Sequence, residues 1–362
     1  MKILYVCEWP YNLFRALIKA INSENEQDIL ITEYIEGMSC ICEELKKSKL
    51  FGNVYFFDGC KYKIYRRNVK GINKFKVENI TDIKDHSINL FYMVIAFFNY
   101  LKTQRTAKKI TLPEGLDIEK YDEIHITDCT STINFFLYHR KQKNIIYVEH
   151  GKNALAGKYL KILNVLRYLA KLRIIHGIRG SNRYIKAIEV SENKNLISDT
   201  KGKEIRELSI DKLVGDLSSE QGEFIYQIYA KAYNFNFDES LIVDMFLTTA
   251  IDGETRDAVH LAVCENVMAE YMSDADIIVI KPHPVDKTDY TPLIGKDKRC
   301  VIIPPCVSAE VFTLSTSLKV RKLINIDSSA AGYLQTIEEN ITLGYKYLKD
   351  KGFSYTDNPY SD

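Results

Sequence analysis

The chain alternates short apolar runs with segments that repeat apolar residues every three or four positions. The first run, Lys2–Cys7, reads KILYVC and is followed by a loop and by a helical pattern through Phe14, Leu17 and Ile18. A near-continuous apolar run is typical of a strand buried on both faces of a parallel sheet. We therefore predict a strand, a loop and a helix at the start of the chain.

The same alternation extends through the first half of the chain. Stretches with helical character separate further apolar runs, and such an order of strands and helices predicts a parallel sheet covered by helices. The further predicted strands are Asp28–Thr32, Val54–Phe57, Glu123–Thr127 and Asn144–Val148.

A polar stretch interrupts this pattern between Ser191 and Gly222, and we place an interdomain region there that ends near Asp238. The alternation of strands and helices then restarts. It predicts strands at Leu241–Ala250, Asp276–Lys281, Cys300–Ile303 and Lys322–Ile326, and helices at Glu254–Met272 and Ala309–Ser315.

With 362 residues, the chain exceeds what one hydrophobic core usually holds, so two domains are expected. The predicted fold class is α/β, with two Rossmann-like domains facing a cleft. We assign residues 1–235 to an acceptor-side domain and residues 236–335 to a nucleotide-donor domain. Residues 336–362 form a helical tail that we expect to cross back to the first domain, and the sequence has helical character from Tyr333 to Phe353.

Composition and charge exclude several classes of function and partner. Apolar residues at 46% and charged residues at 27% describe an ordinary globular protein, and a net charge of +1 argues against a nucleic-acid partner. The opening MKILYV lacks the regions of a secretory signal, so we expect a cytoplasmic chain. None of the eight cysteines has the two-residue spacing that zinc sites favour, and we expect neither a metal nor another cofactor.

Two stretches bear on membranes. The uncharged run Ser87–Leu101 is shorter than the roughly 20 residues that a membrane-spanning helix needs, which favours a buried helix over a spanning one. The segment Lys152–Arg183 contains eight lysine and arginine residues and no acidic one, interleaved with leucines. It is either a solvated helix face or a peripheral contact with the anionic inner face of the cell membrane or with an anionic acceptor.

Polar side chains follow three of the predicted strands, where doubly wound sheets bind their ligands. The first group is Glu149, His150 and Gly151, in which an acid and an imidazole leave a buried strand and a glycine permits a sharp turn. Either side chain could act as a general base. Alternatively, Glu149 caps the next helix or pairs with a basic residue while His150 only packs.

The second group, Lys281-Pro-His283-Pro284, ends an apolar strand with a histidine between two prolines that restrict its backbone. Imidazolium and ammonium groups there would neutralise charge on a departing phosphate. The third group, Ser328 and Ser329, stands where a helix should begin, and such a helix end binds anions through backbone N–H groups. A plain serine cap is the alternative.

The order and spacing of these three groups resemble the bacterial lipooligosaccharide sialyltransferase and capsular polysialyltransferase families. Their shared marks are an acidic pair before glycine, a His-Pro pair and a serine pair, and their opening strand and helix are similar to residues 1–21 here. The resemblance implies a GT-B type fold and a CMP-sugar donor, CMP-sialic acid above all. It also implies that His283 contacts or protonates the donor phosphate, that Ser328 and Ser329 bind CMP, and that Glu310 contacts the nucleotide.

One residue departs from that pattern, because His150 stands where the families have a second acidic residue. A histidine before this glycine makes the chain similar to the glycerophosphate polymerases of teichoic acid and capsule synthesis. Those enzymes also have a Lys-x-His-Pro and a serine pair. We expect an inverting, metal-independent transfer of sialic acid to a glycan of a surface polysaccharide or lipooligosaccharide, the acceptor being free or lipid-linked. We favour His150 as base, with Glu149 orienting it.

Two other functions stay open. One is a transferase that builds a glycerophosphate-type polymer from a CDP-alcohol, and the other is an inactive relative that binds nucleotide sugars. The Asp274-Ala-Asp276 sequence resembles the metal-binding pair of metal-dependent glycosyltransferases, but it precedes its strand instead of following it. We therefore interpret it as a loop.

Overall fold

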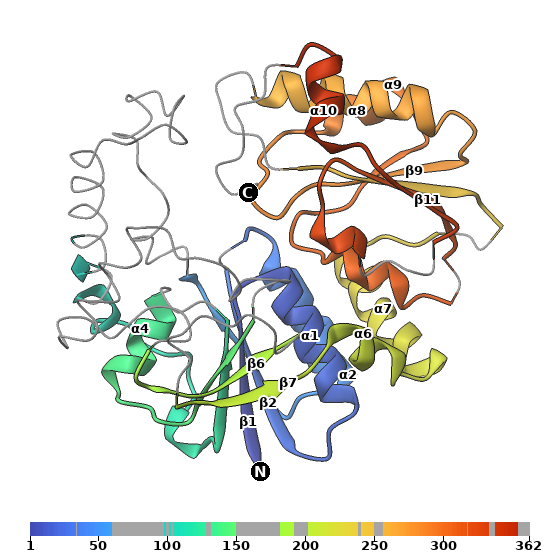
Figure 1. The fold of residues 1–362 in the computed structure, drawn as a ribbon. Helices are drawn as coiled ribbons and strands as arrows, with labels where there is room; N and C mark the ends of the chain where they lie inside the picture. The colour runs from blue at the N-terminus through green and yellow to red at the C-terminus, as the bar shows by residue number, and fades with distance from the viewer. Residues whose placement is uncertain are drawn as a thin grey trace.

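The computed structural model of the chain describes residues 1–33, 35–59, 98, 101–102, 105–127, 132–149, 182–191, 202–237, 240–249, 256–316, 318–332 and 337–353. These residues form two parallel sheets with helices packed against them, as Figure 1 shows. The predicted fold class, an α/β chain with two Rossmann-like units, is confirmed. We call the seven-stranded sheet and its helices the first lobe, and the five-stranded sheet and its helices the second lobe.

The first sheet has the strand order β3-β2-β1-β4-β5-β6-β7. Five of its strands were predicted from apolar runs, and β6 and β7 were not. Its strands are β1 (Lys2–Cys7), β2 (Glu26–Thr32), β3 (Val54–Phe57), β4 (Glu123–Ile126), β5 (Ile145–Val148), β6 (Ile185–Val190) and β7 (Glu204–Glu207).

The second sheet has the order β10-β9-β8-β11-β12, and its neighbouring strands also pair in parallel. Four of its strands were predicted, whereas β12 was not. Its strands are β8 (Val243–Leu247), β9 (Ile277–Lys281), β10 (Cys300–Ile302), β11 (Val320–Asn325) and β12 (Glu339–Thr342).

Helices occupy most of the connections between described strands. The predicted helix at Ala309–Ser315 is the 3-10 helix η6. In the first half of the chain the helices are α1 (Pro10–Ile21), η1 (Met38–Ile41), α2 (Cys42–Ser48), η3 (Ile118–Lys120), α4 (Thr132–His139), α6 (Ile210–Gly215) and α7 (Ser219–Tyr233). In the second half they are α8 (Arg256–Tyr271), α9 (Thr291–Lys296), η6 (Ala309–Thr313), η7 (Ser329–Gly332) and α10 (Gly344–Asp350).

One cluster of buried apolar side chains spans both lobes. Helix α1 begins at Pro10, whose fixed φ suits a first helical position, and buries Phe14 and Leu17 completely. The same cluster of buried side chains continues through α7 to Phe312 of η6 and Leu323 of β11. Burying a phenylalanine or leucine side chain contributes about 1.5–3 kcal/mol, so this junction is a substantial source of stability.

The polar stretch that we interpreted as an interdomain region contains a strand and two helices, and this differs from the prediction. Helix α7 begins with a capping box, in which Ser218 Oγ accepts from the Gln221 N–H at 3.1 Å and Gln221 Oε1 accepts from the Ser218 N–H at 2.9 Å. A Cβ at Gly222 would lie 3.0 Å from the carbonyl oxygen of Leu314, so glycine allows α7 to approach the second lobe closely.

The end of the chain also differs from the expected helical tail. Strand β12 pairs with β11, and Leu348 of α10 is fully buried in the core of the second lobe. Residues 337–353 therefore pack on the second sheet, and residues 354–362 lie outside the described part. The domain boundaries at residues 235 and 335 stay a proposal.

Candidate functional site

Each sheet has one point where the order of its strands reverses. In the first sheet, β2 and β3 follow on one side of β1 and β4 lies on the other; in the second, β9 and β10 follow on one side of β8 and β11 lies on the other. Open α/β sheets bind ligands outside the carboxyl ends of their strands at such points. The candidate sites are therefore the strand ends after β1 and β4, and those after β8 and β11.

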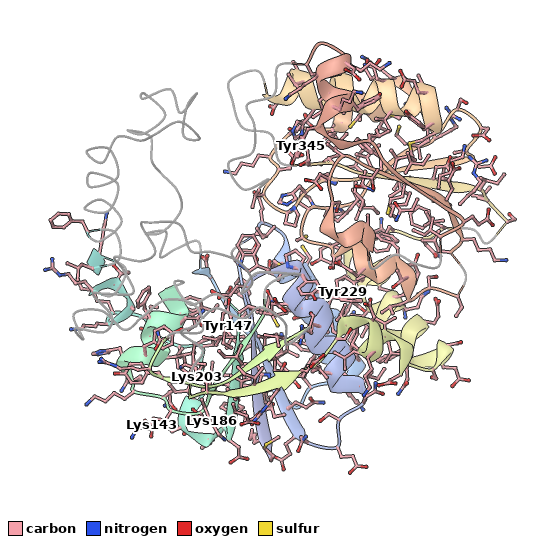
Figure 2. All side chains as sticks on the ribbon, viewed as in Figure 1. Lys143, Tyr147, Lys186, Lys203, Tyr229 and Tyr345 are labelled. Atoms are coloured by element: carbon pink, nitrogen blue, oxygen red, sulfur yellow. The ribbon has the colours of Figure 1, made fainter. Side chains whose placement is uncertain are left out.

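The carboxyl edge of the first sheet points toward the second lobe. Tyr229 of α7 lies at the junction of the lobes, as Figure 2 shows. Burial raises the pKa of Tyr229 well above its ordinary value, and the nearby Cys7 and Glu310 groups raise it further. Because Cys7 ends β1 and Glu310 belongs to η6, the end of β1 lies close to the second lobe.

In the second sheet, the predicted His-Pro and serine groups occupy the same edge. Leu247 of β8 is in register with Lys281 of β9 on one side and with Asn325 of β11 on the other. His283 and Ser328 follow those two strand ends by two and three residues. The structure thus places Ser328 at the switch point and His283 one strand away, on the other side of the β8 end.

His283 is exposed, and its backbone is held firmly. Its N–H donates to Thr248 Oγ1 at 3.1 Å, and its carbonyl accepts from the Asp286 N–H at 2.8 Å. Ring Nδ1 accepts from the Val285 N–H at 3.4 Å. An accepting Nδ1 places the proton of a neutral imidazole on Nε2, so that nitrogen is the hydrogen-bond donor.

Lys281 has a different environment from the one the sequence suggested. The residue is only 4% exposed, and its Nζ donates to the carbonyls of Pro282 at 2.5 Å and Pro305 at 3.4 Å. Burial lowers the pKa of Lys281 to about 8. In this structure the ammonium group joins two loops at the strand ends, and its contact with a donor phosphate stays a prediction.

The serine pair lies beside a side-chain anchor. Asn325 Oδ1 accepts from the Ser328 N–H at 3.1 Å, while Asn325 Nδ2 donates to Thr342 Oγ1 at 3.1 Å. Ser329 begins η7, which is a 3-10 helix of only four residues. The expected helix N-terminus is therefore a short turn with little macrodipole, and anion binding here would depend on individual N–H and hydroxyl groups.

Glu310 is buried at the junction of the lobes. Ser308 Oγ donates to its Oε2 at 2.5 Å, and burial raises the pKa of the carboxyl group. Lys281 and Glu310 affect each other electrostatically, so the structure brings these two predicted residues near one another. The nucleotide contact expected of Glu310 stays a prediction.

The first predicted group is described only through Glu149. Its carboxylate is buried and accepts from the Ser191 N–H at 2.8 Å, and its own N–H donates to the Glu189 carbonyl at 2.9 Å. Both bonds attach the end of β5 to the end of β6. His150 and Gly151 lie outside the described residues.

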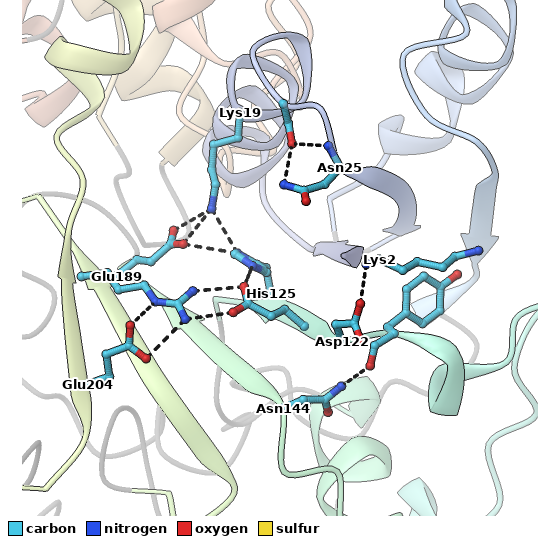
Figure 3. Close-up of polar contacts among 12 residues, drawn as sticks. Lys2, Lys19, Asn25, Asp122, His125, Asn144, Glu189 and Glu204 are labelled. Carbon is cyan, nitrogen blue, oxygen red and sulfur yellow. Dashed lines mark hydrogen bonds and ion pairs between the residues drawn. The ribbon is translucent and has the colours of Figure 1, made fainter.

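A buried network of charged groups, which the sequence did not reveal, lies between α1 and the first sheet (Figure 3). Lys19 Nζ donates to both carboxylate oxygens of Glu189, at 2.8 and 2.9 Å, and lies 3.1 Å from His125 Nδ1. On the other side of the ring, His125 Nε2 lies 3.1 Å from Glu123, which also binds both terminal nitrogens of Arg206 at 2.9 and 3.0 Å.

The pKa values in this network follow from burial and charge. Burial lowers the pKa of His125, so its ring is neutral and can accept from Lys19 while donating to Glu123. Hydrogen bonds from His125 and Arg206 hold the pKa of Glu123 at about 2. Burial acts to raise the pKa of Glu189, but Lys19 and the other nearby cations outweigh it and the pKa is also about 2.

A small cavity borders this network near the carboxyl ends of β1 and β4. Its volume of about 20 Å³ has room for about one water molecule. Arg15 and Asn12 contribute buried atoms to its lining: the Nε and Nη1 atoms of Arg15 and the Oδ1 atom of Asn12 have no hydrogen-bond partner within the described part of the chain. A single water could therefore accept from the guanidinium and donate to the amide.

Asp274 and Asp276 have structural partners at the amino end of β9. Asp274 accepts from the two terminal nitrogens of Arg321 at 2.7 and 2.8 Å, and Asp276 accepts from the Ile242 N–H at 2.8 Å. Among the described residues, no three His, Cys, Asp or Glu side chains are grouped to hold a metal ion.

The membrane contact predicted for Lys152–Arg183 is not tested, because residues 152–181 lie outside the described part. In the ranges that the structure covers, no helix combines the length and apolar character that crossing a membrane requires.

Comparison with known proteins gives fold-level likenesses only. No protein-family model and no curated protein matches the chain. Among solved structures, the wall teichoic acid polymerase TagF is 10% identical with a TM-score of 0.45, covering 100% of this chain and 75% of its own. The UDP-GlcNAc 2-epimerases of Neisseria meningitidis and Methanocaldococcus jannaschii both have a TM-score of 0.43. They are 11% and 13% identical, and cover 91% and 99% of this chain and 79% and 94% of their own.

Proposed function

We propose that this protein is an inverting, metal-independent glycosyltransferase that moves sialic acid from CMP-sialic acid to a glycan acceptor. The observation that supports it best is the carboxyl edge of the second sheet, where His283 and Ser328 lie on either side of the β8 end. An imidazole and a set of N–H and hydroxyl donors suit the phosphate of a nucleotide. We infer that the transferred sugar is sialic acid from the resemblance of the three motifs to those of bacterial sialyltransferases.

In the proposed reaction, the acceptor hydroxyl oxygen forms a bond to the anomeric carbon of the donor. The bond between that carbon and the phosphate oxygen breaks, and CMP leaves with the electron pair. His283 donates a hydrogen bond or a proton to the departing phosphate, which stabilises the charge that develops in the transition state. The acceptor proton passes to a base on the first lobe.

For that base we propose His150, with Glu149 as the residue that orients it. The Glu149 carboxylate is buried and already accepts from the Ser191 N–H, an arrangement that suits an anchor better than a mobile proton acceptor. The test is the pH dependence of kcat/KM for the parent, Glu149→Gln and His150→Asn. If His150→Asn retains most activity while Glu149→Gln abolishes it with donor binding intact, Glu149 is the base instead.

One residue favours a second candidate, a transferase that uses a CDP-alcohol and makes a phosphodiester. That residue is His150, because a histidine before glycine is typical of the glycerophosphate polymerases. The two reactions differ in the atom attacked: carbon in sugar transfer and phosphorus in glycerophosphate transfer. A phosphodiester gained by the acceptor, detected by mass spectrometry as the added mass of a glycerophosphate-type unit, would therefore replace our first candidate with the second.

The direct test of the proposal is a thermal-shift screen of CMP, CDP, UDP and GDP in the presence of EDTA. We expect CMP to stabilise the protein by about 2.7 kcal/mol at 100 times its dissociation constant. Ser328→Ala should weaken this effect, whereas Ser48→Ala, on α2 of the first lobe, serves as the matched control. A preference for UDP or a strict need for Mn²⁺ would refute the donor assignment.

A further inference from the structure

Behind the exposed His283, the second lobe buries a cluster of four polar side chains, those of Thr248, His260, Asp286 and Tyr290, which we call the Asp286 cluster. Its centre is the Asp286 carboxylate, which is fully buried. Asp286 Oδ2 accepts from Tyr290 OH at 2.6 Å and lies 2.9 Å from His260 Nδ1, and its Oδ1 accepts from the Thr288 N–H at 2.9 Å. Thr248 Oγ1 completes the set by donating to Oδ2 at 3.2 Å.

This cluster reaches His283 through two of its members. Thr248 Oγ1 accepts from the His283 N–H at 3.1 Å while donating to Asp286, and the Asp286 N–H donates to the His283 carbonyl at 2.8 Å. Both backbone polar groups of His283 are thus bound by two residues that are themselves hydrogen-bonded to each other. The Thr248 N–H also donates to the Lys281 carbonyl at 3.1 Å, which ties the end of β8 to the end of β9.

Burying a charged carboxylate is costly, and apolar side chains of similar size can often fill such a volume at no loss of stability. Burial acts to raise the pKa of Asp286, but hydrogen bonds from His260, Tyr290 and the Thr288 N–H outweigh it and keep the pKa below its ordinary value. The carboxylate is therefore charged, and its donors come from the residue after β8, from α8 and from the loop that follows His283. A charge with this many fixed partners determines the conformation of the loop.

We propose that Thr248 and Asp286 are positioning residues for His283, holding its imidazole where it meets the donor phosphate. This inference rests on the proposed function, because it concerns the same histidine. A displacement of about 1 Å in a group that acts on the transition state can lower a rate about 100-fold. Thr248 is the more specific of the two, since its hydroxyl oxygen is shared between the His283 backbone and the carboxylate.

Thr248→Val tests the inference, because valine keeps the shape of threonine and removes the hydroxyl. We expect kcat to fall by about 10- to 100-fold with the donor dissociation constant changed less than about 3-fold, and Thr248→Ser to recover most of the loss. Tyr290→Phe is the matched control, since it removes a shorter hydrogen bond to Asp286 without touching His283. It should lower the melting temperature and leave kcat within about 3-fold.

A second measurement does not need activity. In histidine-labelled protein, the ring signals of His283, assigned with His283→Gln, should shift and broaden in Thr248→Val and stay in place in Tyr290→Phe. If the Thr248→Val protein does not fold, Thr248→Ala also removes the hydroxyl and has a smaller side chain. Unchanged ring signals in the threonine variants, or an equal loss of kcat in Tyr290→Phe, would overturn the inference. A parent without transferase activity would refute the proposed function alone, and the ring signals would still decide the positioning role.

Discussion

The ion pair between Lys19 and Glu189 allows the energetic role of the buried network to be measured. Lys19→Met keeps a long unbranched side chain and removes the ammonium group, which lies 2.8 Å from the Glu189 carboxylate. The Glu189 side chain is 4% exposed, so water cannot replace the lost partner. Its remaining cationic neighbour is Arg15, whose Nη2 lies 3.8 Å away.

The expected loss follows from these distances. At 2.8 Å and an effective dielectric constant of about 20, the gross attraction between the charges is about 6 kcal/mol, part of which offsets the cost of burying both. Breaking a buried pair by removing one partner costs about 3–5 kcal/mol, and Arg15 reduces the damage. We therefore expect Lys19→Met to lower the free energy of unfolding by about 3 kcal/mol.

The assay is urea unfolding at pH 7, followed by circular dichroism. Lys46→Met is the matched control, because Lys46 pairs with Glu43 at 2.7 Å on the surface, where both side chains are more than half exposed. It should leave the free energy of unfolding almost unchanged, because water solvates both exposed charges. Adding Glu189→Gln to Lys19→Met should recover part of the loss, since no buried charge then lacks its partner. Equal effects of Lys19→Met and Lys46→Met would refute this reasoning.

Three further outcomes are expected. Because the pKa values of Glu123 and Glu189 are lowered to about 2 in the folded state, their contribution to stability is present above about pH 5 and should be lost as the pH falls toward about 2, as acid-unfolding curves will show. His283→Ala should reduce turnover by about 10²–10⁴-fold with little change in melting temperature; near-normal turnover would remove its leaving-group role. Ser328→Ala combined with Ser329→Ala should weaken donor binding more than turnover at saturating donor, measured by calorimetry and initial rates.

Continuous apolar runs were sufficient to predict nine of the twelve described strands, because strands of a covered parallel sheet are buried on both faces. The three that were missed contain charged or polar residues. In β6, Glu189 is buried against Lys19, and in β7, Arg206 reaches across the sheet to Glu123. Local periodicity cannot show that a charge has a partner more than 80 residues away, so β6 was not predicted and β7 lies within the polar stretch that we interpreted as an interdomain region.

Helix α7 was not predicted for another reason: its apolar residues are interspersed with polar ones, and it begins at a pair of serines. The capping box formed by Ser218 and Gln221 is a local signal that identifies its start. Strand β12 has three exposed residues among its four, and its polar sequence Glu-Asn-Ile-Thr fits an edge strand that packs little. Its place is set by pairing with β11, which again is a contact between distant segments.

The candidate site divides by exposure into two kinds of residue. Glu149, Lys281 and Glu310 were predicted for their chemistry, yet each is buried and hydrogen-bonded to a backbone or hydroxyl group. His283 is exposed after the end of β9, and Ser328 is half-buried after the end of β11. A charged group buried at a strand end fixes the conformation of the adjacent loop. Hydrogen bonds to backbone groups offset the cost of its desolvation only in that conformation. Replacing one of the three buried groups should therefore reduce stability first, whereas replacing His283 or Ser328 should reduce function first.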